Sequence, residues 1–159
     1  MPAPPLWGVA GLKRFVHEHR VGWHETDLAQ VVYFANYLTY LEMAELELFR
    51  SLGKGEMDWM EEFKMRLPRV EAFCQYKHPA RFDDLLEIEL AVEVDGKALI
   101  FHGDIYRKED RKLLARGYIK ALCTEWDGKR WVKGRELPQD LIDFLKPYTI
   151  KREIYGGPP

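Results

Sequence analysis

A chain of 159 residues, of which 47% are hydrophobic and 31% charged, has the composition of one globular domain, and this excludes an intrinsically disordered chain. Lysine and arginine number 24 against 26 aspartate and glutamate residues, so no overall positive charge favours nucleic acid or an anionic membrane as a partner. No apolar run approaches the ~20 residues that a membrane-spanning helix needs.

The two ends of the chain are rich in proline and glycine, and the segment between them has the patterning of a folded domain. We therefore divide the chain into a Pro-rich lead (1–12), a domain (13–147) and a tail (148–159). The lead lacks the charged segment followed by an apolar segment that defines a signal peptide. The two cysteines, Cys74 and Cys123, have no redox or metal-binding spacing, which is typical of reduced thiols, and we expect a cytoplasmic protein.

Residues 15–23 are predicted to form the first strand. Aromatic, histidine and β-branched side chains fall on one face of this segment, with the period of two that a half-buried strand shows. The polar, turn-forming residues 24–30 that follow predict a loop.

The next element has helical spacing. In residues 34–52 apolar side chains recur every three or four positions and cover most of the circumference, and Gly53 is placed to end the helix. At 1.5 Å per residue the helix is roughly 27 Å long. A helix that is apolar on most sides should be largely enclosed, so we expect it at the centre of the core. Residues 55–64 are interpreted as a second, short helix.

Strand character returns after residue 67. Hairpin signals stand at Asp95-Gly96 and Asp127-Gly128, and a charged turn separates the strands between them. The predicted strands are 70–77, 86–94, 98–106, 113–126 and a short one at 131–132.

A last helix is predicted at residues 138–146, because Pro138 suits the first turn and Pro147 ends the helix. One long helix cannot cover both faces of such an antiparallel sheet. We therefore expect the uncovered face to meet another subunit through apolar side chains, which makes a homo-oligomer.

Two motifs lie on either side of the predicted long helix. Residues 24–37 read His-Glu-Thr-Asp-Leu-Ala-Gln-Val-Val-Tyr-Phe-Ala-Asn-Tyr, and residues 73–84 read Phe-Cys-Gln-Tyr-Lys-His-Pro-Ala-Arg-Phe-Asp-Asp. They closely resemble the signature of the 4-hydroxybenzoyl-CoA thioesterase family: a Thr-Asp or Cys-Asp pair, a short loop usually ending in glycine, Val-Tyr-x-x-Asn-Tyr opening the helix, and a later Pro-Ala-Arg-x-Asp-Asp turn. The resemblance covers approximately residues 13–126.

One residue departs from this signature. Gln30 stands where the family usually has glycine, a residue that would permit positive φ or a close approach to substrate. We expect Gln30 either to adjust the loop or to reach into the site.

The resemblance implies an α+β protein with the hotdog fold, in which a curved antiparallel β-sheet wraps around one long central helix. Family members form dimers with continuous sheets, often paired again into tetramers as dimers of dimers, and their active sites lie at the dimer interface. The implied reaction is hydrolysis of an acyl-CoA thioester to the free acid and coenzyme A. We expect no metal and no organic cofactor, since coenzyme A is part of the substrate.

By the same resemblance, Asp27 is the catalytic carboxylate. An ionised carboxylate can attack the thioester carbonyl and form an anhydride, or it can take a proton from the attacking water. The sequence leaves both routes open. The alternative interpretation is that Asp27 only forms a turn or caps a helix.

The thioester oxygen gains negative charge during hydrolysis and needs hydrogen-bond donors, which backbone amides at a helix N-terminus supply. We expect these amides at Val32, Tyr33 and Phe34 or, from the partner chain, near Arg66 and Leu67.

Other residues of the first motif are expected to shape the site. Tyr33 and Phe34 would form part of the acyl pocket, and Asn36 would fix the loop or cap the helix. His24 and Glu25 lie close enough in sequence to assist the catalytic carboxylate, in a lesser role.

The phosphates of coenzyme A favour lysine or arginine on the binding surface. The alternative for each such residue is an ordinary solvated charge at a hairpin or sheet edge. The candidates are Lys77, Arg81, Arg107, Lys108, Arg111 and Lys112.

Two other functions fit a hotdog fold, because fold alone does not decide function. One is a non-catalytic acyl-CoA-binding protein. The other is a hydratase or dehydratase, which would need a catalytic histidine paired with a carboxylate, and His24 is the nearby candidate. A serine mechanism of the α/β-hydrolase type is disfavoured, because the chain has no Gly-x-Ser-x-Gly motif.

Overall fold

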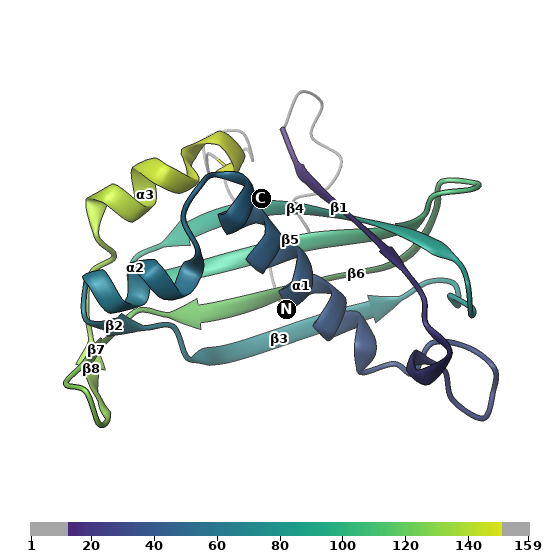
Figure 1. Cartoon of the computed structure of the whole chain (residues 1–159), viewed down its shortest axis with the longest axis horizontal. Helices are drawn as coiled ribbons and strands as arrows, with labels where there is room; N and C mark the ends of the chain where they lie inside the picture. Colours follow the sequence, from purple (N-terminus) through teal and green to yellow (C-terminus); the bar gives the residue numbers. More distant parts are fainter. Residues whose placement is uncertain (1–12, 151–159) are drawn as a thin grey trace, which may run out of the picture.

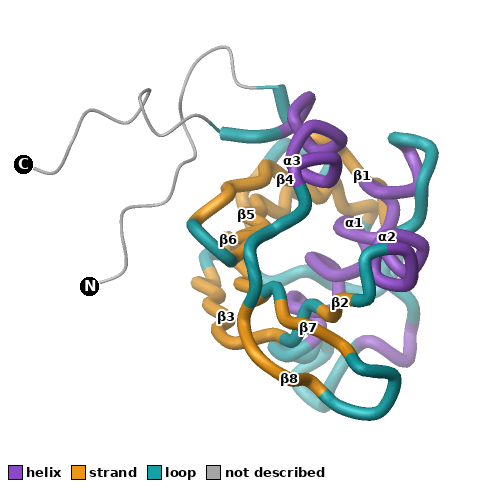
Figure 2. The backbone as a smooth tube through the Cα atoms, turned by 90° about the vertical axis from the view of Figure 1, so that its left-hand side faces the viewer, coloured by secondary structure: helices purple, strands orange, loops and turns teal. Residues whose placement is uncertain are grey.

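A five-stranded antiparallel sheet forms the main layer of the molecule, and its helices lie on one face (Figures 1 and 2). The computed structural model describes residues 13–150. The strand order is β1-β4-β5-β6-β3, with bounds β1 (Phe15–Arg20), β3 (Arg69–Tyr76), β4 (Leu85–Asp95), β5 (Ala98–Arg107) and β6 (Lys112–Leu122). A second, smaller sheet lies at one end of the molecule and consists of β2 (Met65–Arg66), β7 (Thr124–Trp126) and β8 (Trp131–Gly134).

Helix α1 (Asn36–Ser51) is the predicted long helix, and it packs across the sheet (Figure 1). Leu41, Leu48 and Phe49 on its sheet-facing side are at most 1% exposed. The packing on β5 is so close that a Cβ atom at Gly103 would lie 2.3 Å from the Leu41 side chain. The α+β architecture with one long helix on an antiparallel sheet is therefore confirmed.

The shorter helices lie at the end of the molecule that carries the small sheet (Figure 1). They are α2 (Glu56–Glu62) and α3 (Gln139–Leu145), followed by the 3-10 helix η2 (Lys146–Tyr148). The short helix predicted at 55–64 and the last helix predicted at 138–146 are confirmed, with ends that differ by one or two residues.

Two predicted strands end earlier than expected. The segment 15–23 stops pairing after Arg20, because Val21 bonds instead to Asp84 in the turn before β4, and residues Trp23–Glu25 form a 3-10 helix, η1. The segment 113–126 divides into β6 and β7, because the amide of Cys123 donates to the carbonyl of Lys97 and leaves the β6 ladder.

The sheet face that lies away from α1 carries both charged and aromatic side chains. Asp104 is 1% exposed and lies 3.2 Å from Arg14 and 3.3 Å from Arg116. On the same face, the exposed Phe73 of the edge strand β3 stacks on Tyr118, with 5.7 Å between ring centroids. The contact of this face with another subunit stays a prediction, and the edge strands are the part of the sheet with unpaired backbone groups.

Three further expectations concern the whole chain. No helix within residues 13–150 is both long and apolar enough to cross a membrane. Cys74 and Cys123 are both unpaired. The lead 1–12 and residues 151–159 of the tail lie outside the described residues.

Candidate active site

Asp27 lies on a tight loop between η1 and α1. The loop is closed by its own backbone, because the Asp27 amide donates to the Val31 carbonyl at 2.9 Å and the Gln30 amide donates to the Asp27 carbonyl at 2.9 Å. One carboxylate oxygen, Oδ1, accepts the amide of Ala29 at 2.8 Å. The turn-forming role of Asp27 is therefore real, but it occupies only one oxygen of the carboxylate. Within residues 13–150 the other oxygen accepts no hydrogen bond.

Gln30 has a left-handed backbone conformation, with φ of 63°. This is the conformation that glycine adopts without the clash between Cβ and the following carbonyl. The loop therefore keeps the shape that glycine would permit. The Gln30 side chain is exposed and does not line the neighbouring cavity.

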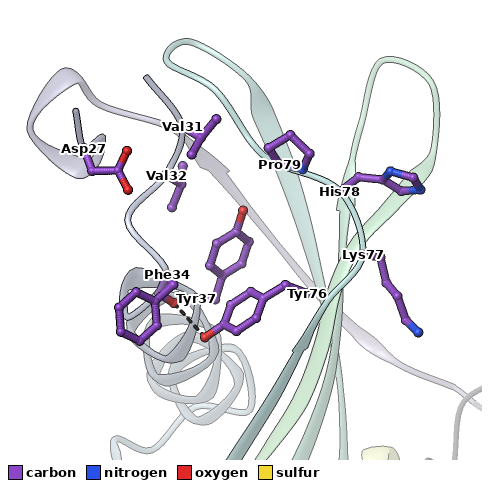
Figure 3. A pocket seen from close by; sticks show the side chains of 9 residues that line it. All are labelled: Asp27, Val31, Val32, Phe34, Tyr37, Tyr76, Lys77, His78 and Pro79. Atoms are coloured by element: carbon purple, nitrogen blue, oxygen red, sulfur yellow. Dashed lines mark hydrogen bonds between the residues drawn. The ribbon is translucent and has the colours of Figure 1, made fainter. Parts of the chain in front are cut away.

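A cavity of about 300 Å³ lies beside this loop (Figure 3). The Asp27 carboxylate points into it from one side, and the end of β3 with the following turn forms the opposite side (Figure 3). The lining is mostly apolar or aromatic and consists of Asp27, Val31, Val32, Phe34, Tyr37, Tyr76, Lys77, His78 and Pro79.

Three aromatic side chains form a fixed wall of the cavity. The Tyr76 ring lies 5.3 Å from the Tyr37 ring and 6.3 Å from the Phe34 ring, between centroids. The Tyr76 hydroxyl donates to the Phe34 carbonyl at 3.0 Å (Figure 3). The Tyr37 hydroxyl accepts the amide of Ala80 at 3.1 Å. Partial desolvation of its hydroxyl raises the pKa of Tyr76 to about 12, so this hydroxyl stays protonated and keeps its donor role at neutral pH. The wall is therefore preorganised before substrate arrives.

The amides at the start of α1 divide into two groups. The amide of Val32 donates to the Ala80 carbonyl at 2.8 Å, and the amide of Tyr33 donates to the Glu25 carbonyl at 2.9 Å. The amides of Phe34 and Ala35 donate no hydrogen bond within the described part of the chain. Of the three amides expected to hold the oxyanion, only that of Phe34 is uncommitted, and the next amide along the chain, that of Ala35, is also uncommitted.

Asn36 fixes the loop. Its Nδ2 donates to the Glu25 carbonyl at 2.8 Å, whereas the N-cap position of α1 is Ala35, which has no capping side-chain bond. Of the two roles expected for Asn36, the structure shows the loop contact.

Other predicted residues lie away from the cavity. His24 is exposed and does not line it. Arg66 lies 2.6 Å from Glu61 and stacks over Trp126 at 4.6 Å. Strand β2, which carries Arg66, lies at the opposite end of the sheet from the start of α1 (Figure 1). Arg66 and Leu67 can therefore reach this cavity only from a second chain.

The six candidates for phosphate binding also divide. Three of them already form ion pairs with carboxylates: Arg107, Lys108 and Arg111. Arg107 lies 3.0 Å from Asp110, and Arg111 lies 2.9 Å from both Glu87 and Glu89. The side chains of the other three form no ion pair within residues 13–150: Lys77, Arg81 and Lys112. Of these, Lys77 lines the cavity.

Several lining residues are absent from the set expected from sequence: Val31, Tyr37, Tyr76, His78 and Pro79. Their position depends on β3 ending beside the start of α1, which the hydrogen bond between the Val32 amide and the Ala80 carbonyl fixes. The Pro-Ala-Arg turn of the second motif marks this place in the sequence and could have indicated that the residues before it face the loop.

The family model described as "Thioesterase-like superfamily" matches residues 21–145. The chain belongs to this superfamily. Its relatives include the acyl-CoA thioester hydrolase YbgC of Escherichia coli, which is 32% identical over 131 residues that cover 80% of this chain and 92% of that protein.

Solved structures of thioesterases share the fold of this superfamily member. A 1,4-dihydroxy-2-naphthoyl-CoA thioesterase from Synechocystis has a TM-score of 0.76 and 24% identity, covering 84% of this chain and 96% of that chain. A mutant 4-hydroxybenzoyl-CoA thioesterase complexed with 4-hydroxybenzoyl-CoA has a TM-score of 0.73 and 22% identity, covering 83% and 98%. The hotdog fold and the resemblance to the 4-hydroxybenzoyl-CoA thioesterases are confirmed.

Proposed function

We propose that this chain is an acyl-CoA thioesterase, which hydrolyses an acyl-CoA thioester to the free acid and coenzyme A with Asp27 as the catalytic carboxylate. The observation that carries the proposal is the arrangement at the cavity: the Asp27 carboxylate points into it, and the uncommitted amides of Phe34 and Ala35 begin the adjacent helix. Membership of the thioesterase-like superfamily and the likeness to the Escherichia coli acyl-CoA thioester hydrolase support the reaction class.

The chemistry follows from these groups. The Phe34 and Ala35 amides would donate to the thioester oxygen as it becomes negatively charged, and one such donor is typically worth ~10²–10³ in rate. Asp27 either attacks the carbonyl carbon, so that the C–S bond breaks and water then hydrolyses the anhydride, or takes a proton from the water that attacks directly. In both routes coenzyme A leaves through its sulfur and the carboxylate is regenerated.

The site needs a second chain in this proposal. Strand β3 is an edge strand, and antiparallel pairing of two such strands across a two-fold axis brings the start of one near the end of the other. The Arg66 and Leu67 of a partner would then approach the Tyr76 end of the cavity. We propose a homodimer on this basis, with a tetramer as a dimer of dimers, acting in the cytoplasm without nucleic acid or membrane partners.

The test is thiol release from butyryl-CoA and benzoyl-CoA, followed with a thiol-reactive dye. We expect turnover by the natural chain and a loss of at least about 100-fold in kcat for Asp27→Asn, because the amide neither attacks a thioester nor accepts a proton from water. Asp127→Asn is a matched control, since Asp127 also holds a turn by accepting backbone amides, at Lys129 and Arg130, but on a distant hairpin. We expect this control to keep its kcat.

Each alternative predicts a different result. Retention of more than about a tenth of kcat in Asp27→Asn would remove Asp27 from the mechanism. Binding of acyl-CoA without thiol release would indicate a non-catalytic binder. A change in enoyl absorbance without thiol release would indicate a hydratase, for which the exposed His24 lies away from the cavity.

A further inference from the structure

Glu25 is a buried carboxylate at the start of the loop that carries Asp27. It is the last residue of η1 and is only 9% exposed. It does not line the cavity, so it does not contact a substrate there. Burying a carboxylate costs several kcal/mol unless its oxygens are hydrogen-bonded. The groups that donate hydrogen bonds to this carboxylate therefore identify the parts of the chain that it connects.

The side chain of Glu25 joins the loop to the sheet. Its Oε1 lies 2.7 Å from Nε2 of His19 on β1, and its Oε2 accepts the amide of Gly22. The His19 ring packs on Tyr40 of α1, with 4.9 Å between centroids. Burial alone would raise the pKa of Glu25, but the hydrogen bonds from Gly22 and His19 outweigh it and lower the pKa below its ordinary value. Glu25 is therefore ionised at neutral pH and acts as an acceptor.

The backbone of Glu25 joins the loop to the start of α1. Its carbonyl accepts both the amide of Tyr33 at 2.9 Å and Nδ2 of Asn36 at 2.8 Å. These two donors stand on either side of Phe34 and Ala35, whose amides are the proposed oxyanion donors. The same residue is thus tied to β1 by its side chain and to the helix start by its carbonyl.

Asp27 itself forms no hydrogen bond to β1 or to the start of α1 within the described residues. All of its hydrogen bonds within the described residues run to positions 29–31 of its own loop. These bonds fix the shape of the loop but not its distance from α1. A connection between the loop and the helix must come from the ends of the loop, and Glu25 supplies it at one end.

We propose that Glu25, oriented by His19, is a positioning residue that sets the distance between the Asp27 carboxylate and the amides of Phe34 and Ala35. The inference rests on the proposed function. A misplacement of about 1 Å at reacting groups can cost ~10² in rate. Loss of the contact should therefore lower kcat, whereas binding of acyl-CoA should persist, because Glu25 does not line the cavity.

The test compares two Glu–His pairs in the same chain. Glu93 lies 2.9 Å from Nε2 of His102 on the sheet, with side-chain exposures of 14% and 11%, against 11% and 20% for Glu25 and His19. We expect Glu25→Gln to lower kcat about 10- to 100-fold with KM changed less than about threefold. Glu93→Gln should lower the melting temperature by a similar amount and leave kcat unchanged.

Variants of His19 test the second part of the proposal. His19→Leu should reproduce the kcat loss of Glu25→Gln. His19→Gln retains an N–H donor that can reach the carboxylate, and we expect it to recover part of kcat. Equal kcat losses in Glu25→Gln and Glu93→Gln, or a change confined to KM, would overturn the proposal.

Amide hydrogen exchange separates this inference from the proposed function. In Glu25→Gln we expect the amides of Asp27 and Tyr33 to exchange at least about tenfold faster, while those of β5 are unchanged. Unchanged exchange at these two amides contradicts positioning by Glu25, whatever the activity. If the natural chain releases no thiol but the exchange changes as expected, the proposed function fails and the structural role of Glu25 stands.

Discussion

Gln30 has a strained backbone conformation in the loop that carries Asp27. Its φ of 63° places a residue with a Cβ atom in the left-handed region, at a cost of roughly 1–2 kcal/mol. Glycine removes this cost. Because glycine also has more conformational freedom in the unfolded chain, the gain in folding free energy is reduced by about 0.4–1 kcal/mol. We therefore expect Gln30→Gly to raise the free energy of unfolding by about 0.5–1 kcal/mol, measured by urea denaturation, with kcat unchanged.

The control for Gln30→Gly is Gln139→Gly at the start of α3, where φ is not positive. There the same substitution should destabilise the protein by up to about 1 kcal/mol. Equal effects of the two substitutions would show that Gln30 is not strained. A loss of kcat in Gln30→Gly alone would show that the Gln30 side chain reaches the substrate.

Single residues of the site were predictable to different degrees. Asp27, Phe34 and Asn36 stand at fixed positions of a sequence motif, so their placement together at the cavity or the helix start could be foreseen. The contact between Glu25 and His19 could not, because it depends on the bend after β1 that brings η1 back over the strand. No local pattern of hydrophobic and polar residues records such a bend.

Three elements meet at a buried ionic cluster far from the proposed site. Glu45 of α1 is 0% exposed and Glu56 of α2 is 5% exposed, and Nη2 of Arg69 on β3 lies 2.9 Å from the first and 3.8 Å from the second. Burial raises the pKa of both carboxyl groups, and the repulsion by Glu56 adds to the effect at Glu45, in spite of the opposing attraction of Arg69. The cluster joins α1, α2 and the edge strand through Arg69 and two carboxyl groups that bind protons more tightly than usual.

This cluster predicts a stability that falls as pH rises. Both carboxyl groups bind protons more tightly in the folded chain than in the unfolded chain, so their contribution is complete below the ordinary pKa of about 4.5 and is lost as pH rises through the raised values. Glu45→Gln removes one ionisation and keeps the shape. We expect its melting temperature, relative to the natural chain, to increase as pH rises above the ordinary pKa, measured by scanning calorimetry.

Glu47→Gln is the control for this pH dependence, because Glu47 lies on the same helix but is partly exposed and paired with Arg50. Its melting temperature should follow that of the natural chain at every pH. If the melting temperatures of Glu45→Gln and the natural chain fall in parallel as pH rises, Glu45 is already ionised in the folded protein. The raised pKa of Glu45 would then be wrong.

Elements with many periodic residues were predictable, and very short ones were not. The long helix and the strands of the main sheet carry enough alternation or helical spacing to be read from sequence. Strand β2 has two residues and forms because Met65 and Arg66 pair with Glu125 and Thr124. The partner lies some sixty positions away, so nothing local marks the strand.

The contact with a second chain belongs to the scale of the whole molecule, and it stays a prediction. Alternation identified which strands have one buried face, and part of the other face is neutralised by ion pairs such as those of Asp104. At the sheet edge formed by β3 the side chains of Val70, Phe73 and Tyr76 are exposed. An edge of this kind can pair with another strand, and a second copy of the chain is the partner that we propose.

If two copies pair through β3 across a two-fold axis, the residues at mid-strand approach their own counterparts. Ala72 stands near the middle of β3 (Arg69–Tyr76) and is exposed in the single chain. Like charges placed directly opposite each other across paired strands destabilise the pairing, and opposite charges stabilise it. We therefore expect Ala72→Glu and Ala72→Lys each to give monomers in analytical ultracentrifugation and to lose most thiol release, whereas Ala72→Ser remains a dimer. An equal mixture of the Glu and Lys variants should restore both dimers and activity, because each charge then faces its opposite. Dimers that persist in both charged variants would place the subunit contact elsewhere, and monomers that keep thiol release would show that the cavity does not need the partner's residues.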